Sequence, residues 1–311
     1  MIPALVLTVS SALGLLAATS LVPALLAGVS TPDSLGRPDP GLNAELAAVA
    51  AELGISGLAD AGRASLALVD LTGGPVYAGI AADSTLGAAS MAKLAILLGA
   101  FAAGEAGRLE LTSDLLQSLE RMIRASSNPD ATLAIERVGF PAIAAALEDP
   151  RHALHDPVRG GLWVGSDYTG GKVWRREARS RQTHAASAAA VARFYVLLHR
   201  NELVSPAASA AMREMLASTT QDHKFVAGLR EAAGGPSPRA GEPVAVPGYR
   251  ILRKSGSWGP WQADSALIEC AGRRYVLVCL LADRKGGERR LRRLAVAVDR
   301  LIERRHPAAR E

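Results

Sequence analysis

Hydrophobic positions follow two different periods along this chain of 311 residues. Beyond residue 41, Leu and Ala recur at helical spacing over residues 42–53, which predicts a first helix. Alternating apolar and polar positions at residues 64–71 and 76–80 then predict two strands. The sequence between them, Thr-Gly-Gly-Pro at residues 72–75, is typical of a hairpin turn, so we expect the two strands to pair.

The middle of the chain shows helical periodicity over most of its length. We predict helices at residues 90–103, 111–125, 129–138, 140–147, 185–199 and 206–216. Pro129 suits the first turn of its helix, where the missing N–H leaves no hydrogen bond unmade. Residues 149–183 carry glycine, tryptophan and charge without a clear period, and irregular segments of that length are usually functional or disordered.

The last third of the chain returns to strands. We predict them at residues 249–254, 263–269 and 274–281, followed by a closing helix. This order indicates an α+β fold, in which the two ends of the chain build one antiparallel sheet with the terminal helices on one face. The domain of residues 42–311 then divides into a sheet lobe, residues 42–88 and 248–311, and an all-α lobe, residues 89–247.

The N-terminal segment is distinguished by its lack of charge. Residues 2–29 carry no ionisable side chain and the first is Asp33, so this run is long enough to span a bilayer. A signal peptide fits as well, although its positively charged start is missing, and a buried helix of a cytosolic protein has the same pattern. We expect residues 1–30 to be a signal peptide or membrane anchor and residues 31–41 a linker. The protein would then be exported, either periplasmic or otherwise extracytoplasmic, or membrane-anchored.

Charge narrows the possible partners. The net charge is +5, and much of the excess comes from Arg289, Arg290, Arg292 and Arg293, which lie among apolar residues at helical spacing. This pattern favours a solvated helix face. Since neither interleaved aromatic residues nor a nucleic-acid-binding motif accompanies it, we expect no nucleic-acid partner. We also expect a monomer.

The two cysteines flank a predicted hairpin. Cys270 falls at its turn and Cys279 lies well along the return strand. Their Cα atoms are therefore expected to be farther apart than the about 7 Å that a disulfide tolerates. We predict two buried free thiols.

Three short motifs place serine and lysine where acyl-transfer chemistry needs them. They are S-x-x-K at Ser90 and Lys93, S-x-N at Ser126 and Asn128, and K-S-G at residues 254–256. Each alone also fits a helix cap, a turn or a strand end, so their joint order carries the argument. The chain has 35 basic residues but only five lysines, and lysine occupies both motif positions. Arginine cannot be deprotonated in a protein, whereas a desolvated lysine can act as a base.

The S-x-x-K spacing suits a nucleophile and its base. A neutral hydroxyl attacks an amide or lactam carbonyl poorly, so a nucleophilic serine needs a base within hydrogen-bond reach. At positions i and i+3 of a helix, Ser90 and Lys93 project from the same face, about 5–6 Å apart at Cβ. Lys93 is therefore the candidate base, provided that burial and nearby positive charge lower its pKa. Lys254 is the candidate for that charge and for attracting a substrate carboxylate.

In this order, the motifs resemble those of the penicillin-recognising serine enzymes, the class A β-lactamases and penicillin-binding proteins. The resemblance covers roughly residues 42–306 and implies a β-lactamase/transpeptidase-like fold. It also implies an acyl-Ser90 intermediate and chemistry that needs no metal or other cofactor. Under the same resemblance Ser126 passes a proton to the leaving nitrogen, and Asn128 holds the amide of the substrate's side chain.

The resemblance further implies an oxyanion hole, formed by the backbone N–H groups of Ser90 and Ser257. Ser255 and Gly256, between Lys254 and Ser257, belong to the same expected substrate-binding strand. Two such preorganised donors are each worth about 3–4 kcal/mol of the barrier. The complete expected site therefore combines catalytic side chains with backbone groups of two separate motifs.

Two departures from the resemblance concern the second half of the reaction. Class A β-lactamases use a loop glutamate to activate the deacylating water. The irregular segment here has one glutamate, Glu177, whose context does not match, and Asp156 and Asp167 are the other candidates. The cation expected on the strand after K-S-G is also missing, because Ala263 and Asp264 stand there. Hydrolysis of the acyl-enzyme is therefore left open.

The sequence thus predicts an exported serine hydrolase of the class A β-lactamase-like family, acting on β-lactams or on peptidoglycan-type and related amide carbonyls. The alternative enzyme is a D-alanyl-D-alanine peptidase, or a related amidase or esterase, that deacylates slowly after reaction with β-lactams. An alternative of another class is a non-catalytic cell-envelope binding protein. The missing loop glutamate favours that alternative, and the intact motif set opposes it.

Overall fold

The computed structural model describes residues 35–307. The predicted signal peptide or anchor, residues 1–30, and the start of the linker lie outside the described residues. Within residues 35–307, no helix has both the length and the apolar character needed to cross a membrane.

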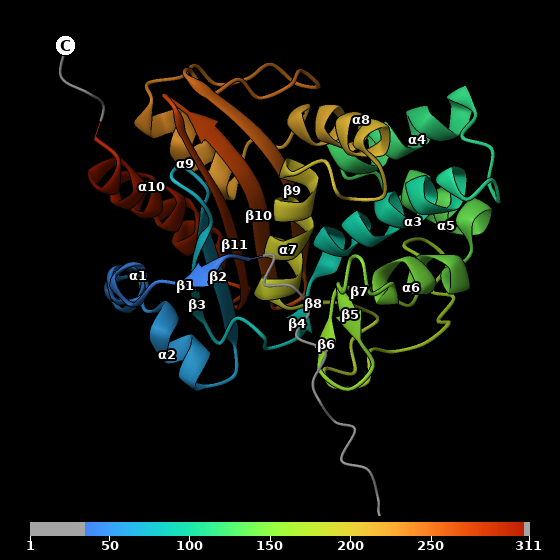
Figure 1. Ribbon diagram of the computed structural model, residues 1–311, viewed down its shortest axis with the longest axis horizontal. Coiled ribbons are helices and arrows are strands. Elements are labelled where there is room, and N and C mark those ends of the chain that lie inside the picture. The colour runs from blue at the N-terminus through green and yellow to red at the C-terminus, as the bar shows by residue number, and fades with distance from the viewer. Residues whose placement is uncertain (1–34, 308–311) are drawn as a thin grey trace, which may run out of the picture. The chain divides into compact units, whose positions relative to one another are not determined.

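One six-stranded sheet joins the two ends of the described chain (Figure 1). Its order is β1-β3-β2-β11-β10-β9. The strands are β1 (Arg37–Pro38), β2 (Ala64–Asp70), β3 (Val76–Ile80), β9 (Tyr249–Trp258), β10 (Trp261–Cys270) and β11 (Arg273–Ala282). Neighbours pair antiparallel, as predicted, except that the two-residue edge strand β1 runs parallel to β3. The predicted hairpin at residues 72–75 joins β2 to β3.

Alternate residues of the strands serve two separate hydrophobic cores, as the pleat requires. Leu66 and Leu68 of β2 face a core shared with the helices of the chain ends, whereas Ala67 and Val69 face the core of the helical part. The first core is covered by α1 (Pro40–Glu52), α2 (Ile55–Asp60), α9 (Lys224–Ala232) and α10 (Gly287–Arg305). On the other face, α7 (Ala188–His199) packs against β2 and β11.

Most helices of the middle segment lie beyond β9 and α7, at the right of Figure 1. They are α3 (Lys93–Glu105), α4 (Ser113–Arg124), α5 (Asn128–Val138), α6 (Phe140–Glu148) and α8 (Pro206–Ala217). The helix predicted from residue 90 starts differently, because residues Ala89–Ala92 form a 3₁₀ turn and the α-helix begins at Lys93. Ten residues of α3 are buried, so α3 is the central helix of this group of helices.

The irregular segment of residues 149–183 forms short strands, β5 (His155–Asp156), β6 (Gly160–Gly161) and β7 (Trp163–Val164). β7 pairs with β8 (His184–Ala186), which in turn pairs with β4 (Leu86–Gly87), the last strand before the 3₁₀ turn. The segment is thereby attached beside the start of α3.

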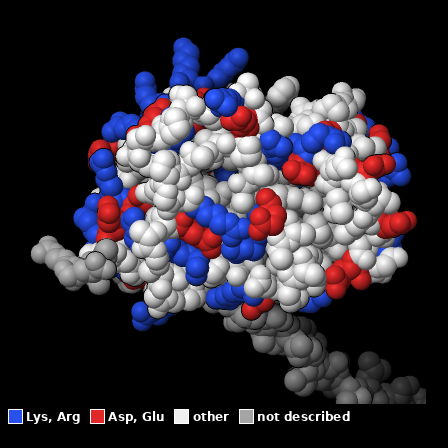
Figure 2. All heavy atoms as spheres, turned by 90° about the horizontal axis from the view of Figure 1, so that it is seen from above, with Lys and Arg blue, Asp and Glu red and all other residues white. Residues whose placement is uncertain are grey.

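The predictions for the two cysteines and for the arginine-rich closing helix agree with the structure. Cys270 and Cys279 are buried free thiols, as expected. Arg290, Arg292 and Arg293 of α10 form ion pairs with carboxylates of neighbouring elements. Basic and acidic side chains are likewise interspersed over the face shown in Figure 2. This arrangement fits a solvated helix face.

Candidate active site

Ser90 lies in the 3₁₀ turn, where strand β9 packs closely against the backbone. A Cβ added to Gly256 of β9 would lie 2.9 Å from the Ser90 nitrogen and 2.8 Å from the Met91 nitrogen. Real Cβ atoms do not approach other atoms so closely, so the glycine of K-S-G allows this contact. The residue before Ser90, Ala89, has a φ of 49°, in the left-handed region. Backbone and glycine together thus fix the position of the serine.

The Ser90 side chain opens into a cleft of about 420 Å³. Three predicted site residues line this cleft, Ser90, Asn128 and Ser257. Among residues 35–307, the Ser90 hydroxyl has no hydrogen-bond partner. Lys93 does not bond to it here, because its ammonium points to the S-x-N loop instead. The nucleophile candidate is therefore accessible and unengaged.

Ser126 lies between the two motif lysines, in the loop from α4 to α5. Lys93 Nζ is 2.6 Å from the Ser126 carbonyl oxygen and 3.5 Å from its hydroxyl oxygen. Lys254 Nζ donates to the same hydroxyl at 2.8 Å. Ser126 has a φ of 58°, a left-handed conformation that costs energy for a residue with a side chain. Such strain persists where surrounding contacts hold it, and here both lysines do so.

Asn128 is placed by the start of α5. Ser127 is the N-cap of this helix and accepts from the Asp130 nitrogen at 3.3 Å, and Pro129 lies in the first turn. The sequence S-S-N-P is therefore both a helix start and part of the site. Asn128 Oδ1 accepts a hydrogen bond from Lys93 Nζ at 2.8 Å. This contact leaves its amide nitrogen free to face the cleft.

Burial lowers the pKa of Lys93 to about 7, although the negative charge of Asp130 opposes the shift. A neutral amine has two N–H groups, and two carbonyl oxygens, those of Ser126 and Asn128, accept from Lys93. The remaining lone pair can then accept a proton. Burial also lowers the pKa of Lys254, and the positive charges of Lys93 and Arg253 lower it further. The two lysines are therefore close, as expected, but burial lowers the pKa of Lys93 without a contribution from the charge of Lys254.

Tyr168, from the irregular segment, covers Lys93 on the cleft side. The Lys93 Nζ lies 4.6 Å from the centre of the Tyr168 ring. The tyrosine is held by its backbone nitrogen, which donates to Thr132 Oγ1 at 3.1 Å, and by its hydroxyl, which donates to the Ala89 carbonyl oxygen at 3.4 Å. Burial raises the pKa of Tyr168 well above its usual value, so the phenol stays neutral. An aromatic ring of the irregular segment thus lies beside Lys93.

The three carboxylates considered as bases instead fold the irregular segment. Glu177 is buried and accepts from the nitrogens of Arg179 and Ser180 and from the Ser180 hydroxyl. Burial raises its pKa, but these hydrogen bonds outweigh burial and the net shift is downward. Asp156 accepts from two backbone nitrogens in the same manner.

Asp167 differs from the other two carboxylates because it lines the cleft. Its oxygens accept from the backbone nitrogens of Gly170, Gly171 and Lys172, at 2.7 to 3.2 Å. Backbone N–H groups therefore hold both carboxylate oxygens in place. Asp167 stays the only one of the three at the candidate site.

A cation lies beside the K-S-G strand, although the cation that the resemblance calls for is missing from β10. In the register, Ala263 pairs with Gly256 and Asp264 with Ser255. Lys224, at the start of α9, reaches between the strands and donates to the Gly256 carbonyl at 2.6 Å and to Ser257 Oγ at 2.8 Å. Burial lowers the pKa of Lys224 to about 8.

The structure thus joins Lys93, Ser126 and Lys254 by hydrogen bonds. Ser90, Asn128 and Ser257 line the cleft, and Asn128 connects the two groups through its bond with Lys93. Sequence reasoning missed Tyr168 and Lys224. Their only sequence signal is the rarity of aromatic residues and lysines, which makes each one a candidate for a special position.

Comparisons with known proteins bear on the family and the fold of the chain. The model of the β-lactamase enzyme family matches residues 45–118 and 112–301. Among solved structures, PBP-A is 19% identical with a TM-score of 0.62, over 86% of this chain and 98% of that chain. A β-lactamase from Sphaerobacter thermophilus DSM 20745 is 18% identical with a TM-score of 0.62, over 83% of this chain and 97% of that chain. The search of curated proteins gave no match.

A third solved structure is a variant of the class A β-lactamase of the last common ancestor of Gram-negative bacteria. It is 18% identical with a TM-score of 0.63, over 83% of this chain and 100% of that chain. At these identities the likeness concerns the fold, and it confirms the predicted β-lactamase/transpeptidase-like architecture.

Proposed function

Because the chain belongs to the β-lactamase enzyme family, we propose that it is a serine hydrolase that forms an acyl-Ser90 intermediate with β-lactam or related amide carbonyls. The observation that carries this proposal is the convergence of two buried lysines on the Ser126 hydroxyl beside an accessible Ser90. A merely structural serine and lysine pair needs no such arrangement, since burying two cations together costs free energy.

In the proposed acylation, Ser90 Oγ bonds to the substrate's carbonyl carbon and its proton passes to the neutral amine of Lys93. The carbonyl–nitrogen bond then breaks, and the Ser126 hydroxyl gives its proton to the leaving nitrogen. Lys254, which already donates to Ser126 Oγ, favours this transfer electrostatically and can return a proton to it. No atom other than those of the protein and the substrate takes part.

Substrate binding would use the groups around these side chains. The backbone N–H groups of Ser90 and Ser257 would stabilise the oxyanion, each by about 3–4 kcal/mol. The free amide of Asn128 would hold the substrate's acyl side chain. Lys254 and Ser255 would receive a carboxylate, and Gly256 lets the strand approach Ser90 closely enough for these contacts.

A second candidate, a penicillin-binding peptidase that deacylates slowly, is favoured by Tyr168. Its ring covers Lys93, and Glu177 is occupied within its own loop. Of the three candidate carboxylates, a water beside the acyl-ester would then have only Asp167 nearby, which already accepts from three backbone N–H groups. The similar PBP-A has been solved, as a mutant, in an acyl-enzyme complex with penicillin G. We propose that an acyl-enzyme also accumulates in this chain, and the natural substrate would be a peptidoglycan-type peptide.

A fluorescent penicillin, followed on a gel and by its rate of hydrolysis, distinguishes these candidates. A stable labelled band with slow turnover is the expected result. Fast turnover without an accumulating band would identify an efficient β-lactamase and exclude slow deacylation. No band and no turnover, for a folded protein, would contradict the hydrolase proposal and leave the cell-envelope binding protein.

We also propose that the protein is exported through its uncharged residues 2–29. The substrates proposed above occur outside the cytoplasm. Cell fractionation of the full chain and of a form lacking residues 1–30 tests this point. The full chain is expected outside the cytoplasm and the shortened form inside it, and equal distribution of both would contradict export.

A further inference from the structure

The segment between α8 and α9 connects the S-x-N loop to the K-S-G strand. Its Gln221 donates from Nε2 to the carbonyl oxygen of Ala125, the residue before Ser126, at 3.1 Å. Its His223 has Nε2 at 3.1 Å from Gln221 Oε1 and at 3.5 Å from Ser255 Oγ. Gln221 and His223 together therefore bridge two walls of the candidate site.

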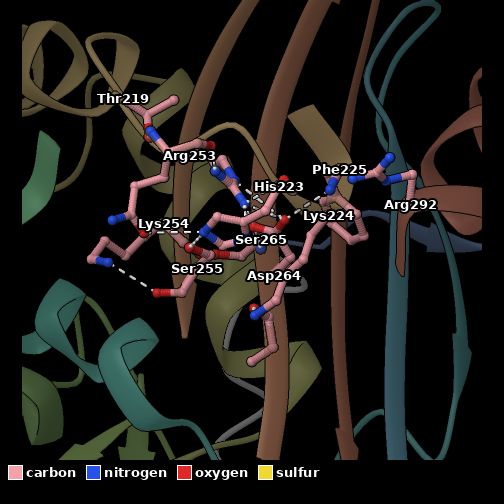
Figure 3. A network of polar contacts seen from close by, with 12 residues as sticks. Thr219, His223, Lys224, Phe225, Arg253, Lys254, Ser255, Asp264, Ser265 and Arg292 are labelled. Atoms are coloured by element: carbon pink, nitrogen blue, oxygen red, sulfur yellow. Dashed lines mark hydrogen bonds and ion pairs between the residues drawn. The ribbon is translucent and has the colours of Figure 1, made fainter. Parts of the chain in front are cut away.

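A buried ion pair holds this bridge against β9 (Figure 3). Arg253 and Asp264 lie on neighbouring strands, with their side chains fully buried and 2.8 Å apart. The same guanidinium donates to the carbonyl oxygens of Gln221, at 2.6 Å, and His223, at 2.9 Å. The backbone of the bridge is thus clamped by a group that is itself neutralised and fixed.

The hydrogen-bond pattern determines which nitrogen of His223 carries its proton. Gln221 Nε2 donates to the Ala125 carbonyl oxygen, so Gln221 Oε1 faces His223 Nε2, and this nitrogen must carry the N–H. The donor-only guanidinium of Arg253, 3.4 Å from Nδ1, is compatible with Nδ1 as an acceptor. Burial and the charges of Arg253 and Lys224 lower the pKa of His223 to about 2. The ring is a neutral Nε2–H donor at any working pH.

The donor role of His223 Nε2 also fixes the direction of the hydrogen bond to Ser255. Among residues 35–307, the Ser255 hydroxyl has no other hydrogen-bond partner than His223. His223 Nε2 carries a single hydrogen, which is shared between Gln221 Oε1 at 3.1 Å and Ser255 Oγ at 3.5 Å. The Ser255 hydroxyl cannot donate to this N–H, so its own proton is unused. We propose that His223 is a positioning residue, which orients the Ser255 hydroxyl so that its proton is donated to a carboxylate of the substrate. The inference rests on the proposed function, because it presupposes that Ser255 binds substrate.

The expected consequence is a preference for anionic substrates. A hydroxyl that is held as a donor stabilises a carboxylate about twice as strongly as it stabilises the neutral carbonyl of an ester at the same place. His223 would then act on substrate capture through Ser255, without touching the reacting carbonyl. An effect that depends on the charge of the substrate distinguishes His223 from a residue that only stabilises the fold.

The test compares acylation by a penicillin with acylation by its methyl ester, which lacks the negative charge. His223→Leu is expected to lower the second-order acylation rate constant for the penicillin about tenfold and that for the ester only about threefold. His223→Gln, which keeps an N–H donor, is expected to recover most of the loss. His199→Leu, the same change at a half-buried histidine of α7 outside the site, is the matched control and should change neither rate constant.

A double-mutant cycle with Ser255→Ala shows whether His223 acts through that hydroxyl. Once Ser255 is alanine, His223→Leu is expected to have no further effect. Equal losses for both substrates, or losses that multiply in the double variant, would overturn the inference while acylation itself stands. Absence of acylation in the wild-type protein would overturn the proposed function and this inference together.

Imidazole ¹⁵N spectra give a readout that does not depend on activity. They are expected to show His223 as the neutral Nε2–H tautomer throughout the pH range in which the protein is folded. A Nδ1–H tautomer, or protonation near pH 6, would overturn the assignment of the donor.

Discussion

The acylation rate should depend on pH through Lys93. Its pKa falls from 10.5 to about 7 because the side chain is buried. Such a shift favours the neutral amine by about 5 kcal/mol, at 1.36 kcal/mol for each tenfold change in proton affinity. The neutral fraction is then roughly 1% at pH 5 and about 90% at pH 8. Because only the neutral amine can take the Ser90 proton, acylation should be about 90-fold faster at pH 8 than at pH 5.

Rapid-mixing kinetics with a fluorescent penicillin between pH 5 and 9 measure this dependence. Lys93→Arg keeps the charge but cannot lose its proton, so it should acylate at least about 100-fold more slowly and without the rise near pH 7. Lys254→Arg is the companion variant, since Lys254 also has a lowered pKa. Lys254→Arg should acylate more slowly than the wild-type protein but keep the rise of the acylation rate near pH 7. A rate independent of pH, or near wild-type acylation by Lys93→Arg, would refute the role of Lys93 as the base.

Two further predictions concern Gly256, with Gly57 as its control, and Glu177. Gly256→Ala should lower the free energy of unfolding by about 1–3 kcal/mol and slow acylation, because the new Cβ meets the backbone of the Ser90 turn. Gly57→Ala, which meets nothing within 4 Å in α2, should be neutral or stabilising by up to about 1 kcal/mol, as thermal unfolding of both variants will show. Glu177→Gln should destabilise the protein by about 1–3 kcal/mol, since it weakens the contacts that fold its loop, and should leave the deacylation rate unchanged. Loss of turnover in a stable Glu177→Gln protein would restore it as the deacylating base.

Elements with a strong period could be predicted from the sequence, whereas α9 could not. Its sequence contains Gly228, which reads as a break in a short apolar stretch. In the structure a Cβ at this position would collide with the backbone of Arg292 in α10. The glycine therefore permits two helices to cross closely and does not end the helix. Only the tertiary contact distinguishes these two uses of glycine.

The candidate site could be predicted as far as its motifs are local. Ser90 and Lys93 are close in sequence, and the motif order placed Ser126 and Lys254 beside them. Tyr168 could not be assigned, because a loop without a period gives no indication of what it covers. Side chains held by backbone N–H groups shape that loop, and such contacts leave no repeating pattern.

The same limit applies to the residues behind the K-S-G strand. Lys224 and His223 come from a segment far from β9 in sequence. Arg253 holds this segment against the strand through the carbonyl oxygens of Gln221 and His223. No spacing rule connects these positions. The missing cation on β10 was therefore noticed from the sequence, whereas the cation beside the strand was not.

The most direct test of the central claim is mass spectrometry of the intact protein after incubation with penicillin, followed by mapping of the modified peptide. The account predicts an increase by the full mass of the antibiotic, located on Ser90, and no increase for a folded Ser90→Ala protein. An adduct on another residue, or one that persists in Ser90→Ala, would contradict it.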